Sequence, residues 1–292
     1  MITIHLTTKD TTLRADGGRL FIKNETVDVS YAFRYIKAIY LGPAIVLDTL
    51  CIAACFKHDI PLYFCRGQGY IYGSTYTPGY GSGSGTILKQ LKLAGSTHGS
   101  LMAAGWLALK FQRRISLLEK MKIKILRDIP ALENCQRLEG SWDAWYWKVY
   151  LTRLSESRIN RRHKRMAADT WNASLNYLYG MLYYLIEREI LRAHLEPYLG
   201  FHHGMARRQK AFLFDVIEPF RPYCEEILWE LQKPLLTLGE LENNELSPEW
   251  RKILASSFYT FIYKKNENRV KRIKIIHRFI KGIAKDIEKY EQ

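Results

Sequence analysis

The chain has 292 residues, of which 47% are hydrophobic, so it can bury a large core in one large domain or two smaller ones. Lysine and arginine number 44 against 29 aspartates and glutamates, and the formal charge of +15 indicates a polyanionic partner, with nucleic acid ahead of an acidic membrane surface. The first residues do not form an apolar signal segment, and the longest apolar stretch, Ser174 to Ile186, is too short to span a bilayer, so we expect a cytoplasmic protein with no membrane partner.

The five cysteines are expected to be buried free thiols. They are odd in number and lack the paired two-residue spacing of a zinc ribbon or a redox motif. Cys51 and Cys55 lie one helical turn apart in an apolar run, where packing is more common than metal ligation. The same interpretation applies to the other three, which are Cys65, Cys135 and Cys224.

The N-terminal part of the chain is predicted to be rich in β-strands. Residues 2–6 alternate in polarity, and residues 12–14 and 19–23 flank an Asp-Gly-Gly turn that is typical of a β-hairpin. β-Branched and aromatic residues favour further strands in residues 27–41, 60–65 and 70–76, whereas residues 45–58 have helical spacing. These patterns predict a small, sandwich-like β domain with one helix.

A glycine-rich stretch follows this domain. Residues 77–86 contain Pro78 and four glycines, a composition typical of a flexible connector. A phosphate-cradling loop is the alternative, but no Lys-Ser or Lys-Thr pair follows the glycines. The predicted organisation is therefore a β domain over residues 1–78, a linker over 79–86 and a second domain over 87–292.

Helix-forming residues dominate the second domain. Amphipathic spacing predicts helices within residues 101–126, 138–154, 171–195, 212–231 and 250–290. Residues 239–248 are predicted to form an exposed acidic connection between two of these helices. The second domain is thus predicted to be all-helical, which makes the whole chain an α+β protein.

Three segments of the helical domain carry residues that could perform chemistry. Glu139 shares a helical face with Asp143 and Tyr146, although a single glutamate near a helix start is more often a surface carboxylate. His202 and His203 fall in a predicted loop just before a basic cluster, where an imidazole could bind a metal or shuttle a proton. A histidine in such a place can also be a structural group, and the pair leaves open which one acts.

The third segment contains two carboxylates, Asp215 and Glu218, within an apolar stretch. Their spacing of three places both on one helical face, and burying two like charges is costly unless a cation neutralises them. A divalent ion is one solution, and pairing with nearby arginines is another. Pro219 removes a helical hydrogen bond and disfavours helical geometry at Glu218, which affects where this carboxylate points.

Taken together and in this order, the three segments resemble the CRISPR-associated spacer integrase family known as Cas-one. The family pattern of an arginine before Glu-Gly and then two aromatics resembles Arg137, Glu139, Gly140, Tyr146 and Trp147. The segment from Leu195 to His203 resembles its Leu-(Asp/Glu)-Pro-x-x-Gly-Phe-x-His motif, which favours His203 over His202. Residues 214–222 resemble its acidic motif ending in Phe-Arg-Pro, and a fourth motif resembles Asn172, Ala173, Tyr177 and Tyr179.

The resemblance covers the whole chain and implies a metal-dependent DNA enzyme. It implies that Glu139, His203 and Glu218 hold a Mg²⁺ or Mn²⁺ ion, with Asp215 as a supporting acid, and that mixed oxygen and nitrogen ligands suit manganese somewhat better. The implied reaction is the attack of a DNA 3′-hydroxyl on a phosphodiester, so that short fragments are joined into a CRISPR array during the adaptation step of antiviral defence. The family also implies a homodimer through the β domain and a complex with a small partner, Cas-two.

Basic side chains are expected to bind the DNA backbone, and this affinity should fall with salt. The predicted DNA-binding residues are Arg137, Tyr146, Arg158, Arg161, Arg162, Arg165, Asn172, Arg207, Arg208, Lys210 and Arg221. A solvated helix face is the alternative for the run that begins at Arg158. The segment from Lys264 to Lys289 carries ten further lysines and arginines around an apolar stripe, and it could dock DNA, dock a partner or be a plain surface helix.

Two other functions remain open at this point. The first is a related transposon-encoded integrase, although such proteins usually append a DNA-binding helical module and this sequence ends soon after its basic helix. The second is a nucleic-acid-binding scaffold without catalysis, in which the carboxylates and His203 satisfy hydrogen bonds in the core.

Overall fold

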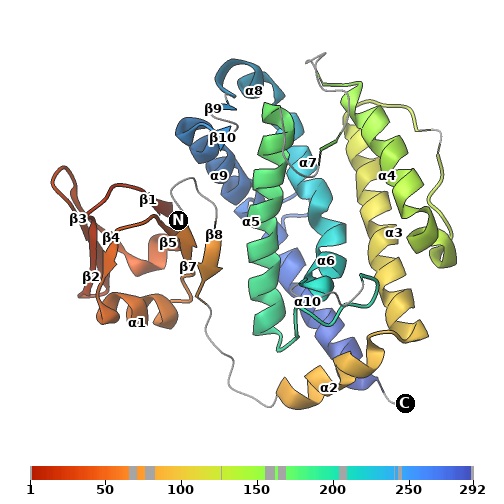
Figure 1. Cartoon of the computed structure of the whole chain (residues 1–292), viewed down its shortest axis with the longest axis horizontal. Coiled ribbons are helices and arrows are strands. Elements are labelled where there is room, and N and C mark those ends of the chain that lie inside the picture. Colours follow the sequence, from red (N-terminus) through yellow and green to blue (C-terminus); the bar gives the residue numbers. More distant parts are fainter. Residues whose placement is uncertain are drawn as a thin grey trace. The chain divides into compact units, whose positions relative to one another are not determined.

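The chain divides into two compact units, Met1–Pro78 and Gly79–Gln292 (Figure 1). The computed structural model describes residues 2–65, 71–75, 83–125, 127–154, 162–163, 169–203, 209–239, 241–242 and 245–290. The first unit is rich in strands and the second is mostly helical, so the α+β fold class predicted from the sequence is confirmed.

The N-terminal unit contains two four-stranded sheets. One sheet has the order β1 (Ile2–Leu6), β5 (Ile36–Leu41), β7 (Leu62–Cys65) and β8 (Ile71–Ser74). The other has the order β4 (Asp28–Ala32), β3 (Arg19–Lys23), β2 (Thr12–Asp16) and β6 (Val46–Leu47). Buried apolar residues from both sheets and from helix α1 (Thr49–Lys57) form one core.

The predicted hairpin connects β2 and β3, and its turn has a clear physical cause. Gly17 and Gly18 both have positive φ angles, 52° and 75°, which suit a two-residue turn that matches the twist of the strands. The predicted helix over residues 45–58 is partly wrong, because Val46 and Leu47 pair with β2 before the helix begins at Thr49. Asp48 caps this helix by accepting a hydrogen bond from the backbone N–H of Cys51.

The predicted linker is shorter than expected at its C-terminal end. Helix α2 (Gly83–Leu93) begins within the glycine-rich stretch, so Gly83, Ser84 and Gly85 are helical. Residues 76–82 lie outside the described part of the chain. All five cysteines are buried and free, as predicted.

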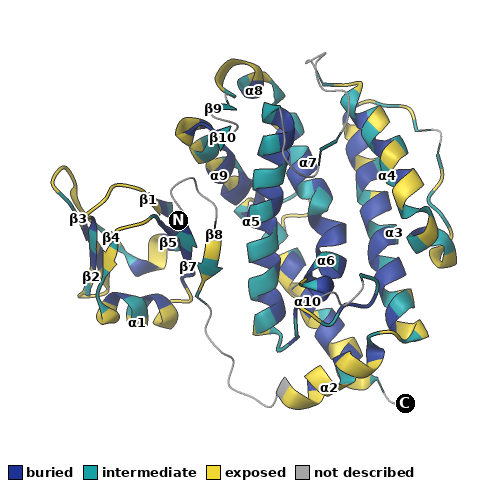
Figure 2. Ribbon diagram, viewed as in Figure 1, coloured by how far each residue is buried: buried dark blue, intermediate teal, exposed yellow. Residues whose placement is uncertain are grey.

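The helical unit is organised around two long helices, α3 (Thr97–Lys120) and α5 (Thr170–Arg192). Helix α6 (Ala211–Ile217) packs against both of them, as does α7 (Arg221–Glu230), and Figure 2 shows buried residues concentrated on these helices. The remaining helices are α4 (Cys135–Leu151), α8 (Gln232–Leu238), α9 (Pro248–Tyr263) and α10 (Arg272–Lys289). No helix in the described ranges is long and apolar enough to cross a membrane.

Three predictions for this unit need correction. The unit is not all-helical, because β9 (Leu241–Glu242) and β10 (Glu245–Leu246) pair within the segment predicted to be an exposed connection, and Leu246 is buried. The helix predicted over residues 212–231 is interrupted by a 3₁₀ turn, Glu218–Phe220, between α6 and α7, and the segment predicted over 250–290 is two helices, α9 and α10, separated by residues 264–271. Pro219 lacks the N–H that a continuous helix would use at the 3₁₀ turn, and Pro222 follows in the first turn of α7.

Candidate active site

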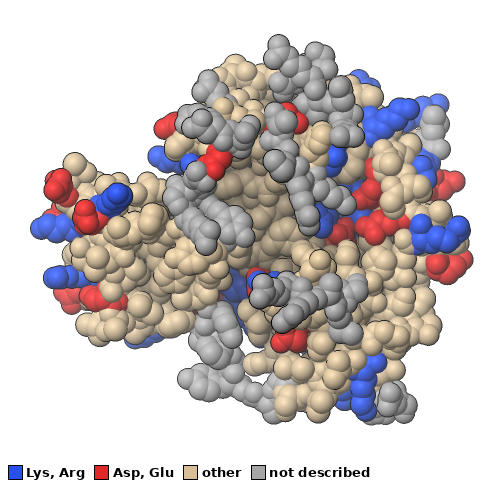
Figure 3. Space-filling view, in the orientation of Figure 1, with Lys and Arg blue, Asp and Glu red and all other residues tan. Residues whose placement is uncertain are grey.

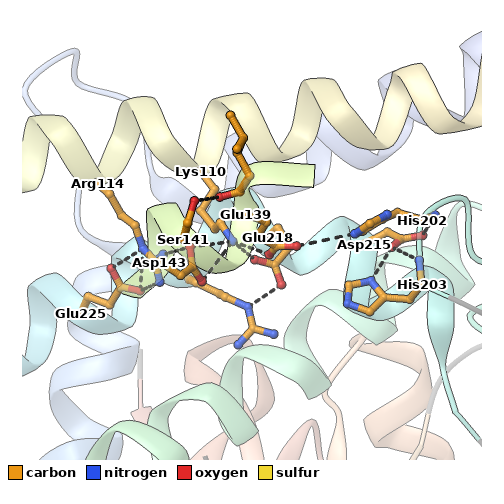
Figure 4. Close-up of polar contacts among 12 residues, drawn as sticks. Lys110, Arg114, Glu139, Ser141, Asp143, His202, His203, Asp215, Glu218 and Glu225 are labelled. Atoms are coloured by element: carbon orange, nitrogen blue, oxygen red, sulfur yellow. Dashed lines mark hydrogen bonds and ion pairs between the residues drawn. The ribbon is translucent and has the colours of Figure 1, made fainter. Parts of the chain in front are cut away.

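Four separate elements place charged side chains in one region of the helical unit (Figure 4). Helix α3 contributes Lys110 and Arg114, which lie one turn apart on its buried face. Helix α4 contributes Glu139 and Asp143 with the same spacing. The 3₁₀ turn contributes Glu218, and α7 contributes further charges, so the cluster exists only when these elements pack together.

Lys110 lies at the centre of this cluster. Its Nζ atom is 2.6 Å from Oε1 of Glu139, 3.0 Å from Oε2 of Glu218 and 3.2 Å from Oδ1 of Asp143. The side chain of Lys110 is fully buried, whereas those of Glu139 and Asp143 are 22% and 26% exposed. Burial opposes the charged form of Lys110, but the carboxylates of Glu218 and Asp143 outweigh it and raise the pKa of the ammonium.

Glu218 points into the cluster from a helical backbone. Its φ and ψ angles are −51° and −47°, so Glu218 keeps helical geometry although the following Pro219 disfavours it. The turn is held from outside by Arg113, whose Nη1 donates to the carbonyl oxygen of Pro219 at 2.6 Å. Arg221 donates to Oε1 of Glu218 at 2.7 Å. Although burial favours the neutral acid, Arg221 and Lys110 together lower the pKa of Glu218 to about 2.

Asp215 organises the loop that carries the two histidines. Its Oδ2 accepts hydrogen bonds from the backbone N–H groups of Phe201 and His202 at 2.6 and 3.0 Å, and its Oδ1 accepts from the N–H of His203 at 3.0 Å. The same Oδ1 lies 2.6 Å from Nδ1 of His203. A carboxylate in this position favours the proton on Nδ1 and leaves Nε2 of His203 as the acceptor. Asp215 is therefore a positioning acid for this loop.

The two histidines approach different acids. Nε2 of His202 lies 3.5 Å from Oε2 of Glu139, while His203 contacts Asp215. The contact with Glu139 raises the pKa of His202, against the effect of burial. Burial alone would raise the pKa of Glu139. The contacts with His202 and Lys110 have the larger effect, so the pKa of Glu139 is lowered. The side chains of His202 and His203 are 26% and 36% exposed, so the cluster is open to solvent on this side.

A second buried carboxylate, Glu225, lies behind the cluster. Arg114 donates to Glu225 at 2.7 Å through Nη2 and to Asp143 at 2.7 Å through Nη1, so it links the two acids. Tyr146 and Tyr179 donate their hydroxyl hydrogens to Glu225 at 2.6 and 2.8 Å. Glu225 is fully buried and receives all these donors at once, and through Arg114 the group supports Asp143.

Most of the predicted DNA-binding residues that the structure describes are engaged within the protein. Tyr146 and Asn172 are completely buried, and their contact with DNA stays a prediction. Arg162 donates to the side chains of Asn172 and Asn176, and Lys210 pairs with Glu187 at 2.6 Å. Arg137 donates to Asn134, and Arg221 bonds to Glu218. The predicted residues outside the described part of the chain are Arg158, Arg161, Arg165, Arg207 and Arg208.

Charges of both signs lie close together around the cluster. On the face drawn in Figure 3, acidic and basic side chains are interspersed over the part of the helical unit where α3 and α4 lie. Among the residues that the structure describes, this face therefore carries charges of both signs rather than one continuous basic surface (Figure 3). Within the described ranges, no group of three or more histidine, cysteine, aspartate or glutamate side chains is arranged as ligands of a single metal ion.

The residue types nevertheless fit a divalent cation. Glu139 and Glu218 both contact one positive charge, the ammonium of Lys110, which occupies the place of a cation between them. His202 lies next to Glu139, and the ring centroids of His202 and His203 are 5.2 Å apart. Two carboxylates and an imidazole held by a further carboxylate are a donor set that suits Mg²⁺ or Mn²⁺.

Sequence reasoning missed the cationic half of the cluster. The sequence motifs include neither Lys110 and Arg114 nor Glu225, which is the partner of Arg114. One signal was available, because two cations spaced by four residues interrupt the apolar face of α3 between Leu107 and Leu117. Such buried charges require acidic partners, but the sequence alone does not say which ones.

Comparison with known proteins identifies the family. The family model described as CRISPR-associated protein Cas1 matches residues 4–258, which is most of the chain. The chain belongs to the Cas1 family. A curated relative, CRISPR-associated endonuclease Cas1 1 of Thermus thermophilus, is 25% identical over 274 residues, which cover 88% of this chain and 85% of the relative. The family predicted from the sequence motifs is thereby confirmed.

Solved structures similar to this Cas1-family chain share its fold. A casposase bound to an integration product has a TM-score of 0.83 and 20% identity, with 100% of this chain and 92% of that chain covered. A Cas1 protein from Thermotoga maritima has a TM-score of 0.78 and 17% identity, with 99% and 98% covered. A Cas6-RT-Cas1–Cas2 complex has a TM-score of 0.67 and 14% identity, with 98% of this chain and 35% of that chain covered.

Proposed function

We propose that this chain is a divalent-metal-dependent DNA endonuclease and integrase that inserts short DNA fragments into a CRISPR array in a prokaryotic cytoplasm. Membership of the Cas1 family supports the substrate class, since the curated relatives are named CRISPR-associated endonucleases. The observation that carries the proposal is the pair Glu139 and Glu218, which come from different elements and share one cation position beside two histidines.

The reaction requires few groups. A Mg²⁺ or Mn²⁺ ion held by Glu139, His203 and Glu218 would polarise the target phosphate and stabilise its developing negative charge. A DNA 3′-hydroxyl attacks this phosphate, a new P–O bond forms, and the broken P–O bond leaves another 3′-hydroxyl. One phosphodiester replaces another, so no nucleotide cofactor is needed. When water attacks instead, the same step is hydrolysis and the enzyme acts as a nuclease.

The protein's own residues prepare this step. Asp215 holds the His203 ring through Nδ1, so that Nε2 faces away from the carboxylate and is available as a ligand. Arg221 keeps Glu218 ionised and oriented from the opposite side, with its Nη2 also donating to the hydroxyl of Tyr183 at 3.0 Å. Basic side chains then provide phosphate contacts, for which the candidates include Arg158, Arg161, Arg165, Arg207 and Arg208.

The proposal includes three partners: double-stranded DNA, a second copy of the chain and a Cas2 protein. Joining both strands of a fragment requires two active sites at a fixed separation, which a two-fold dimer provides. The similarity to the Cas1 part of a Cas6-RT-Cas1–Cas2 complex supports a Cas2 partner.

The function is tested by incubating the protein with a short duplex bearing 3′-hydroxyl ends and a supercoiled plasmid. We expect covalent joining that requires Mg²⁺ or Mn²⁺ and is lost by at least about a hundredfold in Glu139→Ala, His203→Ala and Glu218→Ala. Glu230→Ala is the matched control, because Glu230 is a half-exposed carboxylate paired with Lys120 away from the cluster. Joining by Glu218→Ala at the wild-type rate would remove this residue from the mechanism.

A transposon-type integrase is the second candidate, and the similarity to a casposase favours it specifically. The chemistry would be the same and the DNA would differ. A CRISPR integrase should insert fragments next to an array repeat and respond to Cas2, whereas a transposon-type enzyme should prefer defined ends on the incoming fragment. A non-catalytic scaffold would bind DNA and join nothing, with or without metal.

A further inference from the structure

We propose that Lys110 is a built-in counter-cation which holds the metal position of the active site in the metal-free protein and must give up Glu139 and Glu218 when a divalent ion binds. This inference rests on the proposed metal site and deepens it, because it assigns a role to a residue outside the proposed ligand set.

The position of the ammonium is the first argument. Nζ of Lys110 lies 2.6 Å from Glu139 and 3.0 Å from Glu218, the two carboxylates assigned to the metal. A divalent ion that bound both carboxylates would occupy almost the same space as this ammonium. The two positive charges would also repel each other strongly over so short a distance, because the ammonium of Lys110 is fully buried. Both cations cannot make their full contacts at once.

The charge balance is the second argument. Glu218 and Lys110 are buried, and an acid pair without a cation between its members would be costly in such surroundings. Lys110 therefore provides a positive charge that both acids contact before a divalent ion binds. A solvated surface lysine could not do this, and the side chain of Lys110 has no exposed area.

Asp143 provides the place to which the ammonium retreats. It already lies 3.2 Å from Nζ of Lys110 and is 26% exposed, and it is not one of the proposed metal ligands. Arg114 fixes Asp143 in place from the other side at 2.7 Å. When a metal takes Glu139 and Glu218, the long, flexible lysine side chain can keep Asp143 as its partner and remain neutralised.

Two opposite effects follow from replacing Lys110. Lys110→Met removes the competitor, so the affinity for Mn²⁺ should rise by about tenfold or more. The same change leaves the acids without their cation, so the melting temperature in EDTA should fall. A lysine that only supports the fold would give the second effect without the first. A lysine that helps to hold the metal would weaken metal binding.

The experiment measures Mn²⁺ binding by calorimetry, and melting in EDTA and in Mn²⁺, for wild type, Lys110→Met and Lys110→Gln. Lys120→Met is the control, since Lys120 lies on the same helix and pairs with Glu226 and Glu230 outside the site. Its Mn²⁺ affinity should equal that of the wild type. Unchanged or weaker Mn²⁺ binding in the Lys110 variants overturns the proposal.

A measurement on the wild type covers the case in which the variants fail to fold. In protein labelled with ¹⁵N-lysine, the buried ammonium of Lys110 should give an NMR signal that is protected from exchange with solvent. This signal should change when diamagnetic Mg²⁺ is added. An unchanged signal at saturating Mg²⁺ contradicts the proposal. The two proposals can fail separately. Metal binding by the wild type with no gain in Lys110→Met defeats only the role of Lys110, whereas no metal binding by any variant defeats both.

Discussion

Glu218 illustrates how the site controls the charge of a single residue. The carboxyl group is buried, yet its pKa is lowered to about 2 because Arg221 and Lys110 flank it. An ordinary glutamate titrates near 4.5, so the folded protein holds this proton less tightly than the unfolded chain does. The ionised form of Glu218 therefore stabilises the folded state at neutral pH, and acid should remove this contribution.

This difference predicts a specific pH dependence of stability. The stabilisation by Glu218 should be fully present above pH 4.5 and should disappear as the pH falls towards 2. Urea unfolding of wild type and Glu218→Gln at a series of pH values gives the test, without added metal. The free-energy difference between the two proteins should be a few kcal/mol at pH 7 and should shrink steadily below pH 4.5. A difference that stays constant down to pH 3 would contradict the assigned cause.

At the scale of elements, the side chain of Glu225 holds four helices together. It lies on α7, Arg114 lies on α3, Tyr146 lies on α4 and Tyr179 lies on α5. One carboxylate thus receives donors from three other helices and fixes their relative rotation. Because Arg114 also holds Asp143, the alignment of the active-site acids depends on this buried group.

Removing one member of this group should be costly, and removing two should cost much less than the sum. Glu225→Gln and Arg114→Met should each lower the free energy of unfolding by about 3–5 kcal/mol, because each removes one charge of the buried Arg114–Glu225 ion pair. The double variant Arg114→Met/Glu225→Gln should be far more stable than the sum of the two single effects predicts. Chemical denaturation measures all three. Glu226→Gln, which removes the partner of Lys120 nearer the surface, should cost less than about 1 kcal/mol.

The elements themselves were mostly predictable because their signals are local. The hairpin at Gly17 and Gly18 and the amphipathic helices follow from the spacing of residues close together in the sequence. The departures have long-range causes. Val46 and Leu47 become a strand because β2 is beside them, and Glu218 stays helical because Arg113 and Arg221 hold its turn.

The active site was predictable only in part, because some of its contacts also join residues far apart in the sequence. The acids Glu139, Asp215 and Glu218 came from motifs that can be read along the chain. Lys110 could not be assigned to them, since its contacts join residues 29 positions apart or more. Asp215 was expected as a supporting acid, but its bonds to the backbone of residues 201–203 could not be predicted from the motifs.

At the scale of the whole molecule, the N-terminal unit offers an apolar edge for the proposed dimer. Val29 and Tyr31 on the edge strand β4 pair in register with Ile22 and Leu20, so they lie on the face of the sheet that carries the core. Ile22 and Leu20 are 3% and 0% exposed, but Val29 and Tyr31 are 39% and 36% exposed. A second copy of the chain would cover this edge.

Sedimentation velocity tests whether this edge of the sheet forms the dimer interface. The wild type should sediment as a dimer at micromolar concentration, and the double variant Val29→Asp/Tyr31→Lys should shift to monomer, because charges would be buried in the interface. Val46→Asp is the control, since Val46 is exposed on β6 at the opposite edge of the same sheet. A wild-type monomer, or a double variant that remains dimeric, would argue for another interface.

The burial of every cysteine gives the chain internal reporters of local opening. Cys51, Cys55 and Cys65 lie in the N-terminal unit, while Cys135 and Cys224 lie in the helical unit at the start of α4 and within α7. A thiol reagent can alkylate each of them only when the surrounding structure separates. Mass spectrometry of the alkylated peptides would therefore follow the breathing of the two units independently in one untagged sample.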